Sequence, residues 1–498
     1  MTKVGRTNNK IEFGDFQTPR DLTNEISKVL FEMGIKPQSI IEPTCGEGNF
    51  LISAVSQFPT FKRALGIDIN SYYVEVAKAK LKSDAYKEKA TIKEGDFFSF
   101  NWKETIDLLP SPILVIGNPP WVTNSKLGSI GSDNLPEKNN FQNYSGLLAM
   151  TGKSNFDISE WMLLKILDWL NGRSGTLAML CKNSVARKVI EYAWKKGYQL
   201  SEARIYLIDA QKHFDAWVDA CLLVCSFQRN IRETNCKTYS SLHAISPSSE
   251  IGYKSGLLIA DINNYNKWKH LIGIGRGLKW RSGIKHDCSK VMELQKVGDF
   301  YLNGLGEKLI LEDLYLYPML KSSELANGRH PTRWMIVTQK AIGEDTLVIK
   351  EKAPKTWRYL NDHSDYFSKR GSSIYKNKPQ FSIFGVGDYS FSPWKVAISA
   401  LYKKLEFSIV GSLENKPIVL DDTQNFLPCE SYNDAKNTFD LLNTDIAKEF
   451  YKSFIFWDEK RPITINLLKY LDFNKLADIV GKYPFNSIAY LYFPVFEA

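Results

Sequence analysis

The sequence has few cysteines and no long hydrophobic run, and each of these absences excludes a class of protein. Only seven of its 498 residues are cysteine, and they are dispersed without any CxxC pair. This spacing favours reduced thiols over a disulfide framework or a zinc site. No apolar stretch approaches the ~18 residues of a membrane span, and the polar residues 1–13 lack the apolar core of a signal peptide. We therefore expect a cytoplasmic protein with no metal and no membrane partner.

The remaining composition is typical of a folded globular chain. Hydrophobic residues make up 44% of the sequence and charged residues 24%, which argues against extensive disorder. The chain is longer than the ~100–200 residues that usually share one core. Large apolar residues become scarce between positions 230 and 255, around the run Ser246-Pro247-Ser248-Ser249. We therefore predict two domains, 1–245 and 246–498.

The first half alternates between strand-like and helix-like apolar patterns. Predicted strands lie at 38–41, 64–67, 91–93, 113–116, 176–180, 204–208 and 220–227, and predicted helices at 20–33, 49–58, 72–81 and 158–170. This alternation predicts an α/β fold with a doubly wound, mostly parallel, Rossmann-like sheet. The last two strands are joined by a short polar loop, which predicts an antiparallel pair at the sheet edge. The second half is irregular and aromatic-rich, with predicted helices at 434–456 and 465–480, so we expect a mixed α+β domain.

A glycine-containing loop follows the first predicted strand and is a candidate cofactor site. Gly46 and Gly48 allow the backbone to approach a ligand closely. Asp68 ends the next strand, about 20 positions later, where a carboxylate can accept hydrogen bonds from two ribose hydroxyls. A nicotinamide site would need a third glycine in place of Leu51, and the nearby acids Glu42 and Glu47 would repel a pyrophosphate. The loop therefore favours a positively charged cofactor without phosphates, such as S-adenosylmethionine, although many loops of this type are simply tight turns.

Two further segments can contribute to the same site. Asp96 and Phe97 follow the third predicted strand, where the carboxylate can accept from an adenine amine and the ring can stack on the base. Upstream of the first helix, Thr18 is placed to cap the helix, with Pro19 at its first position.

The fourth predicted strand ends in Asn118-Pro119-Pro120-Trp121. The prolines fix the backbone and remove two N–H donors, so the Asn118 side chain and the Pro119 carbonyl remain as acceptors. An adjacent indole ring suits a flat heterocycle that carries an amino group. Taken alone, the tetrapeptide could be a rigid turn, but here it follows the glycine loop, Asp68 and Asp96-Phe97 in order.

With these motifs in this order, the sequence resembles the gamma class of type II DNA adenine-N6 methyltransferases with the TaqI-type two-domain arrangement. The matching segments are Phe16-Gln17-Thr18-Pro19, Glu42-Pro43-Thr44-Cys45-Gly46-Glu47-Gly48, Asp68, Asp96-Phe97 and Asn118-Pro119-Pro120-Trp121. The resemblance implies a cofactor site that includes Thr18, Glu42 and Cys45, and a C-terminal domain that recognises the DNA target. It also implies that Phe214 stacks on a target base flipped out of double-stranded DNA. The family usually has alanine at Thr44 and tyrosine or phenylalanine at Trp121, and both differences preserve the shape of the site.

A basic segment near the start of the second half is the candidate DNA-binding region. Its cations are Lys267, Lys269, Arg276, Lys279, Arg281, Lys285 and Lys290, and between them lie Trp268, Trp280 and several glycines. Such a mixture suits a phosphate backbone, although a solvated loop has a similar composition.

Three other functions remain open from the sequence: an RNA adenine methyltransferase, a protein glutamine methyltransferase, and a DNA-binding protein without catalytic activity. No nuclease signature is visible in this sequence. A separately encoded restriction endonuclease is therefore an expected partner.

Overall fold

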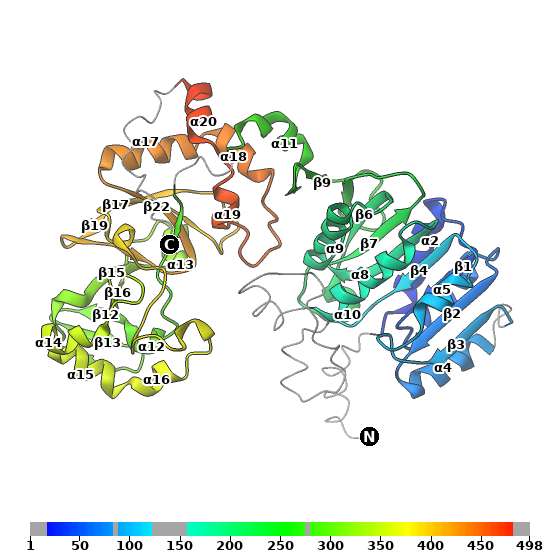
Figure 1. Cartoon of the computed structure of the whole chain (residues 1–498), viewed down its shortest axis with the longest axis horizontal. Coiled ribbons are helices and arrows are strands. Elements are labelled where there is room, and N and C mark those ends of the chain that lie inside the picture. Colours follow the sequence, from blue (N-terminus) through cyan, green and yellow to red (C-terminus); the bar gives the residue numbers. More distant parts are fainter. Residues whose placement is uncertain (1–16, 83–87, 122–156, 274–278, 482–498) are drawn as a thin grey trace. The chain divides into compact units, whose positions relative to one another are not determined.

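The computed structural model describes residues 17–82, 88–121, 157–273 and 279–481 (Figure 1). The chain forms two compact units, Met1–Ile262 and Asn263–Ala498. The boundary expected after residue 245 lies inside the first of these units, between two of its strands. Within the described residues, we find no helix that combines the length and the apolar character needed to cross a membrane.

The first unit is built on a ten-stranded sheet with the order β10-β9-β8-β6-β7-β5-β4-β1-β2-β3. Its strands are β1 (Ser39–Glu42), β2 (Arg63–Asp68), β3 (Ala90–Glu94), β4 (Ile113–Gly117), β5 (Gly175–Lys182), β6 (Leu200–Ile208), β7 (Ala220–Phe227), β8 (Asn235–Tyr239), β9 (Ser249–Lys254) and β10 (Leu257–Ile259). Strands β5, β4, β1, β2 and β3 run parallel to one another, and β7 is antiparallel to both β5 and β6.

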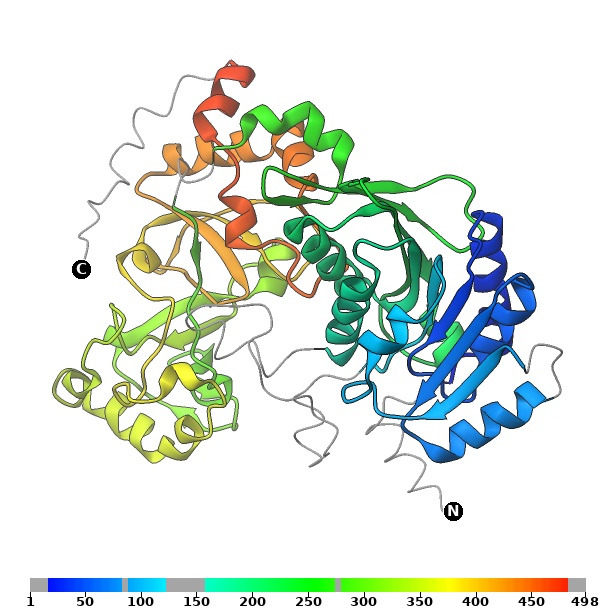
Figure 2. The same ribbon diagram turned by 45° about the vertical axis from the view of Figure 1, so that its right-hand side comes forward.

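Helices cover both faces of this sheet (Figures 1 and 2). They are α2 (Arg20–Glu32), α3 (Asn49–Gln57), α4 (Ser71–Lys82), α5 (Trp102–Asp107), α8 (Ile158–Leu170), α9 (Asn183–Lys196) and α10 (Ala210–Phe214). Helices α2, α3 and α4 share one hydrophobic cluster with alternate strand residues such as Leu114 and Ile116. Helices α8 and α9 pack against each other and against β5. The predicted doubly wound α/β fold is therefore confirmed.

The sheet edge, a helix and a helix cap differ from the expectation. The antiparallel pair β6–β7 does not form the edge, because β8, β9 and β10 extend the sheet beyond β6. Helix α9 was not predicted, since it begins directly at the end of β5 without an intervening loop. Thr18 does not cap α2: the helix starts at Arg20, and the capping position is Pro19, which has no side-chain hydrogen bond.

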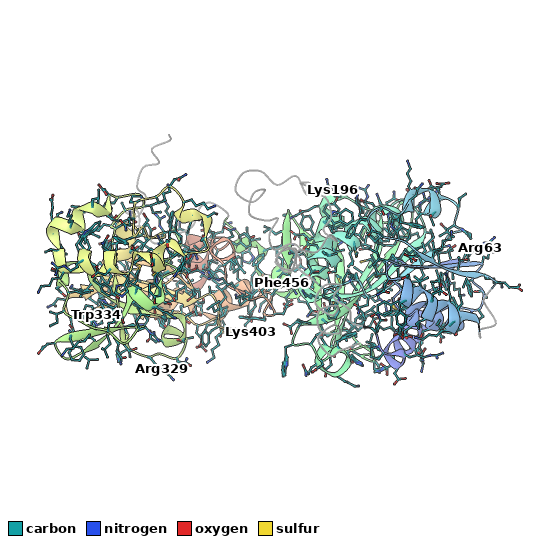
Figure 3. The ribbon with its side chains drawn as sticks, turned by 90° about the horizontal axis from the view of Figure 1, so that it is seen from below. Arg63, Lys196, Arg329, Trp334, Lys403 and Phe456 are labelled. Atoms are coloured by element: carbon teal, nitrogen blue, oxygen red, sulfur yellow. The ribbon has the colours of Figure 1, made fainter. Side chains whose placement is uncertain are left out.

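The second unit contains two main sheets and several short helices. A four-stranded antiparallel sheet has the order β11 (Arg281–Ser282), β22 (Gln424–Cys429), β17 (Trp394–Ser399) and β18 (Ser408–Val410). A six-stranded sheet has the order β14 (Lys308–Leu309), β13 (Phe300–Asn303), β12 (Glu293–Val297), β16 (Arg333–Ile336), β15 (Leu316–Leu320) and β21 (Val419–Leu420). A further hairpin joins β19 (Ser412–Leu413) and β20 (Lys416–Pro417). Trp334 of β16 (Figure 3) is buried in the larger core of this unit.

The helices of the second unit are shorter than the sequence pattern suggests. They are α11 (Ile262–Trp268), α12 (Ser289–Met292), α13 (Ser322–Ala326), α14 (Ile349–Lys352), α15 (Pro354–Asp362), α16 (Ser364–Ser368), α17 (Tyr432–Leu442), α18 (Asp445–Lys452), α19 (Ile465–Leu468) and α20 (Phe473–Val480). The long helix expected over 434–456 is divided at Asn443, because Thr444 caps a new helix by accepting from the Ala447 N–H. The helix expected over 465–480 is likewise divided, and Asp472 caps its second part.

Candidate active site

The candidate residues of the first unit gather at the carboxyl ends of the parallel strands. The glycine loop follows β1, Asp68 ends β2, Asp96 follows β3 and Asn118 follows β4. Strand β1 lies between β2 and β4, so the chain moves outward in opposite directions on its two sides. In open α/β sheets, ligands bind in the crevice at such a switch point. The topology thus brings together motifs that are separated by up to 100 positions in the sequence.

The glycine loop has a conformation that other residues would not easily adopt. Gly46 and Gly48 have φ angles of +49° and +80°, in the left-handed region. A Cβ at Gly46 would lie 2.6 Å from Gln17 Oε1, and one at Gly48 would lie 3.0 Å from the Cβ of Ala77. Asp68 holds the loop in place, because its Oδ2 accepts from the Gly46 N–H at 2.7 Å. Both the backbone angles and the close packing of Gln17 and Ala77 therefore favour glycine at these two positions.

Acidic and buried groups lie beneath this loop. Glu42 is buried and accepts a hydrogen bond from the Leu51 N–H at 2.8 Å. Burial raises the pKa of the Glu42 carboxyl well above its ordinary value, the Leu51 bond opposes this, and the charge of Asp68 adds to it. Burial, with the charges of Glu42 and Asp68, also raises the pKa of the Cys45 thiol. Cys45 is therefore an uncharged packing group, the neutral form of Glu42 is favoured, and Asp68 is the carboxylate whose charge acts on both.

An aromatic cluster forms the wall next to Asp96. The Asp96 carboxylate accepts from the Phe98 N–H at 3.1 Å and from the Ser99 hydroxyl. The structure modifies the expectation for Phe97: its ring is buried against Phe98, Trp102, Trp161 and Trp169, so it offers no free face. Phe98 and Trp161 are only half-buried, with their rings 5.0 Å apart. Phe97 therefore supports the wall, and Phe98 and Trp161 present its surface.

The tetrapeptide after β4 is linked to the cofactor loop by hydrogen bonds. The amide Nδ2 of Asn118 donates to the Thr18 hydroxyl at 3.3 Å. The Thr18 carbonyl in turn accepts from the Asn49 side chain at 2.9 Å, at the start of α3. This network sets the direction of the Asn118 amide. The sequence suggested a helix cap for Thr18, whereas the structure places its hydroxyl on Asn118.

Trp121 and Phe214 are brought together although they lie far apart in the sequence. Their rings meet edge to face, with centroids 5.3 Å apart. Phe214 is the last residue of the short helix α10, not part of an open loop as expected. Asp209 accepts from the Lys212 N–H at the start of this helix, which fixes the approach of the ring. Trp121 follows Pro120 directly in the chain, and both rings are buried in the hydrophobic cluster of the first unit.

Sequence reasoning missed Phe98 and three further residues of this region. Trp161 lies on the amphipathic helix α8, where an apolar residue reads as core. Asp157 caps α8, and its Oδ2 accepts from Lys182 Nζ at 2.6 Å. Lys182 ends β5, and its Nζ also lies 3.5 Å from the Trp121 carbonyl oxygen. A charged residue at the end of an otherwise buried strand was the available signal for Lys182.

In the second unit, several cations of the basic segment already have partners. Lys267 pairs with Glu449 at 2.6 Å, Lys285 pairs with Asp287 at 2.6 Å, and the Arg281 guanidinium covers the Tyr389 ring. Trp280 is buried against Phe407, so its ring is not presented to a ligand. Lys269 and Lys279 are exposed, and the described residues give neither an ion pair. Arg276 lies outside the described residues.

Comparisons with known proteins identify relatives of this chain. The family described as N-6 DNA Methylase matches residues 3–190. The type II methyltransferase M.NspV of Nostoc sp. (strain ATCC 29411 / PCC 7524) is 48% identical over 95% of this chain and 98% of its own length. The type II methyltransferase M.VspI of Vibrio sp. (strain 343) is 24% identical over 40% of this chain and 44% of its own length.

A solved structure extends the likeness to the fold. The type IIL restriction-modification enzyme MmeI, in complex with DNA, matches with a TM-score of 0.53 at 12% identity. The match covers 90% of this chain and 64% of that chain, so the present chain spans just under two thirds of the larger enzyme. The relative that matches almost end to end, together with the family model, shows that the chain belongs to the type II DNA adenine-N6 methyltransferases, whose cofactor is S-adenosyl-L-methionine.

Proposed function

We propose that Asn118 and the Pro119 carbonyl accept the two protons of an adenine N6 amine, and that Trp121 and Phe214 contact the ring of the same base. One observation carries this proposal: the Asn118 amide is held by Thr18, which is itself bonded to Asn49 at the end of the glycine loop. The acceptor for the target amine and the cofactor loop thus belong to one hydrogen-bond network. A displacement of the cofactor loop would therefore also displace the Asn118 amide.

The residues of the glycine loop fit S-adenosylmethionine. Gly46 and Gly48 give the loop its left-handed backbone turns, and Asp68 lies where it can accept from ribose hydroxyls. Phe98 and Trp161 supply half-buried rings for the adenine of the cofactor, and Asp96 supplies an acceptor for its amine. The Asp68 carboxylate favours the positive charge of the sulfonium. When bound, the cofactor supplies an electrophilic methyl group.

The protein's contribution to methyl transfer is positioning and oriented acceptors. The N6 lone pair of adenine is delocalised into the ring, so the free amine is a poor nucleophile. Hydrogen bonds to Asn118 Oδ1 and the Pro119 carbonyl draw the nitrogen toward a tetrahedral geometry and stabilise the positive charge that develops on it. Pro119 and Pro120 hold these acceptors rigidly, which reduces the entropy lost on reaching the reactive geometry.

Adenine N6 is enclosed in the base stack of a duplex, so the target base must leave it. We therefore expect Phe214→Ala to lower turnover about 10-fold or more, because stacking on an aromatic side chain contributes ~1–3 kcal/mol per base. Binding of S-adenosylmethionine should be unchanged. The target is first mapped by sequencing methylated DNA from cells that express the chain. 2-Aminopurine at the target position should then fluoresce with the wild-type protein and less with the variant. A steady signal at every adenine of the mapped site would argue against extrusion.

We further propose that the second unit recognises the DNA target through the exposed cations of its basic segment. Reversing the charges of Lys269 and Lys279 to glutamate should weaken DNA binding and lower the slope of log affinity against log salt by ~1 per lost phosphate contact. Cofactor affinity should stay the same. The control is Lys403→Glu (Figure 3), an exposed lysine outside the segment. An equal loss of DNA affinity in the control, or an unchanged slope in the double variant, would show that this segment is an ordinary solvated surface.

Two expectations about the cellular setting complete the proposal. A separately encoded endonuclease would cleave the sequence that this enzyme protects, and both would act in the cytoplasm. Membership of a restriction-modification family supports this pairing, and the genes next to this one would test it. Among the functions left open by the sequence, the family assignment selects the DNA methyltransferase over the RNA, glutamine and non-catalytic alternatives.

A further inference from the structure

Lys182 and Asp157 form an ion pair next to the catalytic tetrapeptide, and the mechanism described above does not use it. Asp157 is nearly buried, and Lys182 is mostly covered. The ammonium lies 2.6 Å from Asp157 Oδ2 and 3.5 Å from the carbonyl oxygen of Trp121. Burying two charges is costly, so such a pair is weak evidence for stability by itself. Its position suggests a different role.

The remaining atoms of Asp157 are also engaged. Its Oδ1 accepts from the Ser159 N–H at 3.1 Å and from the Ser159 hydroxyl at 2.6 Å, at the first turn of α8. The carboxylate therefore holds the N-terminus of α8 on one side and Lys182 on the other. Helix α8 carries Trp161, which belongs to the aromatic wall of the cofactor site. Lys182, at the end of β5, reaches the carbonyl oxygen of Trp121.

We propose that Lys182 and Asp157 are positioning residues that couple the cofactor wall to the target-base site. The chain Ser159–Asp157–Lys182–Trp121 joins α8, β5 and the tetrapeptide by hydrogen bonds. Through the Trp121 carbonyl, Lys182 fixes the peptide that carries the indole and so the approach of that ring to Phe214. This inference rests on the proposed role of Asn118 and Trp121 in holding the target adenine.

The test measures methyl transfer by the full chain with tritiated S-adenosylmethionine and unmethylated double-stranded phage DNA. Lys182→Met removes the ammonium and keeps the apolar stem. Asp157→Asn removes the charge and keeps an oxygen that can cap α8. Each should lower kcat about 10- to 100-fold, as misplaced reacting groups do, while KM for the cofactor changes little. Lys182→Arg should recover much of the rate because it restores the charge.

The combination of variants separates coupling from simple destabilisation. Because both residues act in one chain of bonds, the double variant should be no slower than the slower single variant. The matched control is Lys188→Met, which removes a similar ion pair, Lys188–Glu160 at 3.0 Å, between the same helix α8 and α9. Its kcat should stay near that of the wild type.

Each measurement has an outcome that would contradict the positioning role of Lys182 and Asp157. A Lys182→Met enzyme with normal kcat, additive losses in the double variant, or an equal loss in Lys188→Met would overturn the positioning role. If Lys182→Met does not fold, Asp157→Asn and Lys182→Arg carry the same test, since both keep a polar group in place. Normal turnover in Asn118→Ala would instead reject the proposed function itself, so the two failures are distinguishable.

Discussion

Replacing Asn118 with alanine is expected to reduce methyl transfer ~10²–10³-fold, the usual effect of losing one oriented group that stabilises developing charge. The affinity for S-adenosylmethionine should stay within a few fold. The hydrogen bond to adenine N6 strengthens as positive charge grows on the nitrogen, so its loss acts mainly on the transition state. The measurement is incorporation of tritiated methyl groups into duplex DNA, followed by nucleoside analysis for N6-methyladenine.

Two further variants give this prediction its controls. Trp121→Phe should be much milder, because a flat ring remains beside Phe214. Thr18→Val should fall between the two, because the Asn118 amide remains but loses the hydroxyl that sets its direction. Label recovered as N4-methylcytosine or in protein would contradict the assignment of the reaction. So would normal turnover without the Asn118 amide.

The fold of the first unit was predictable because its helices and strands carry regular apolar patterns. Strands such as β4 are buried throughout, and helices such as α2 bury one face. Strands β8 and β9 were missed because they are short and largely polar; β8 buries only Cys236 and Tyr239, while β10 is apolar but has only three residues. Such strands are defined by pairing with β6 and with one another, which a local pattern does not reveal.

In the candidate site, too, local motifs were recognisable from the sequence and contacts between distant residues were not. Gly46, Asp68 and Asn118 were found because each belongs to a short motif whose chemistry is local. Asp157 and Lys182 form no motif: they are 25 positions apart and meet only when β5 and α8 are in place. The exchange of roles between Phe97 and its neighbours has the same origin, since burial of the Phe97 ring depends on Trp169 of α8.

Asp68→Ala is expected to weaken S-adenosylmethionine binding by about 100-fold. The carboxylate lies at the end of β2, where Oδ2 accepts from the Gly46 N–H at 2.7 Å and Oδ1 accepts from the Asn70 N–H at 2.9 Å. These two bonds aim the group toward the glycine loop. Hydrogen bonds to a charged acceptor contribute ~1.5–3 kcal/mol each, so losing the contacts with two ribose hydroxyls accounts for the expected change.

Isothermal titration of the intact protein measures this affinity. The matched control is Glu94→Ala, which removes the exposed carboxylate paired in register with Asp68 at the end of the adjacent strand β3. It separates a specific contact from a general loss of negative charge near the loop. Asp68→Asn should lie between the wild type and Asp68→Ala, because one oxygen acceptor remains while the charge is lost. Equal affinities for Asp68→Ala and the wild type would show that Asp68 does not bind the cofactor. An equal loss of affinity in Glu94→Ala would show that Asp68 acts only by electrostatic attraction.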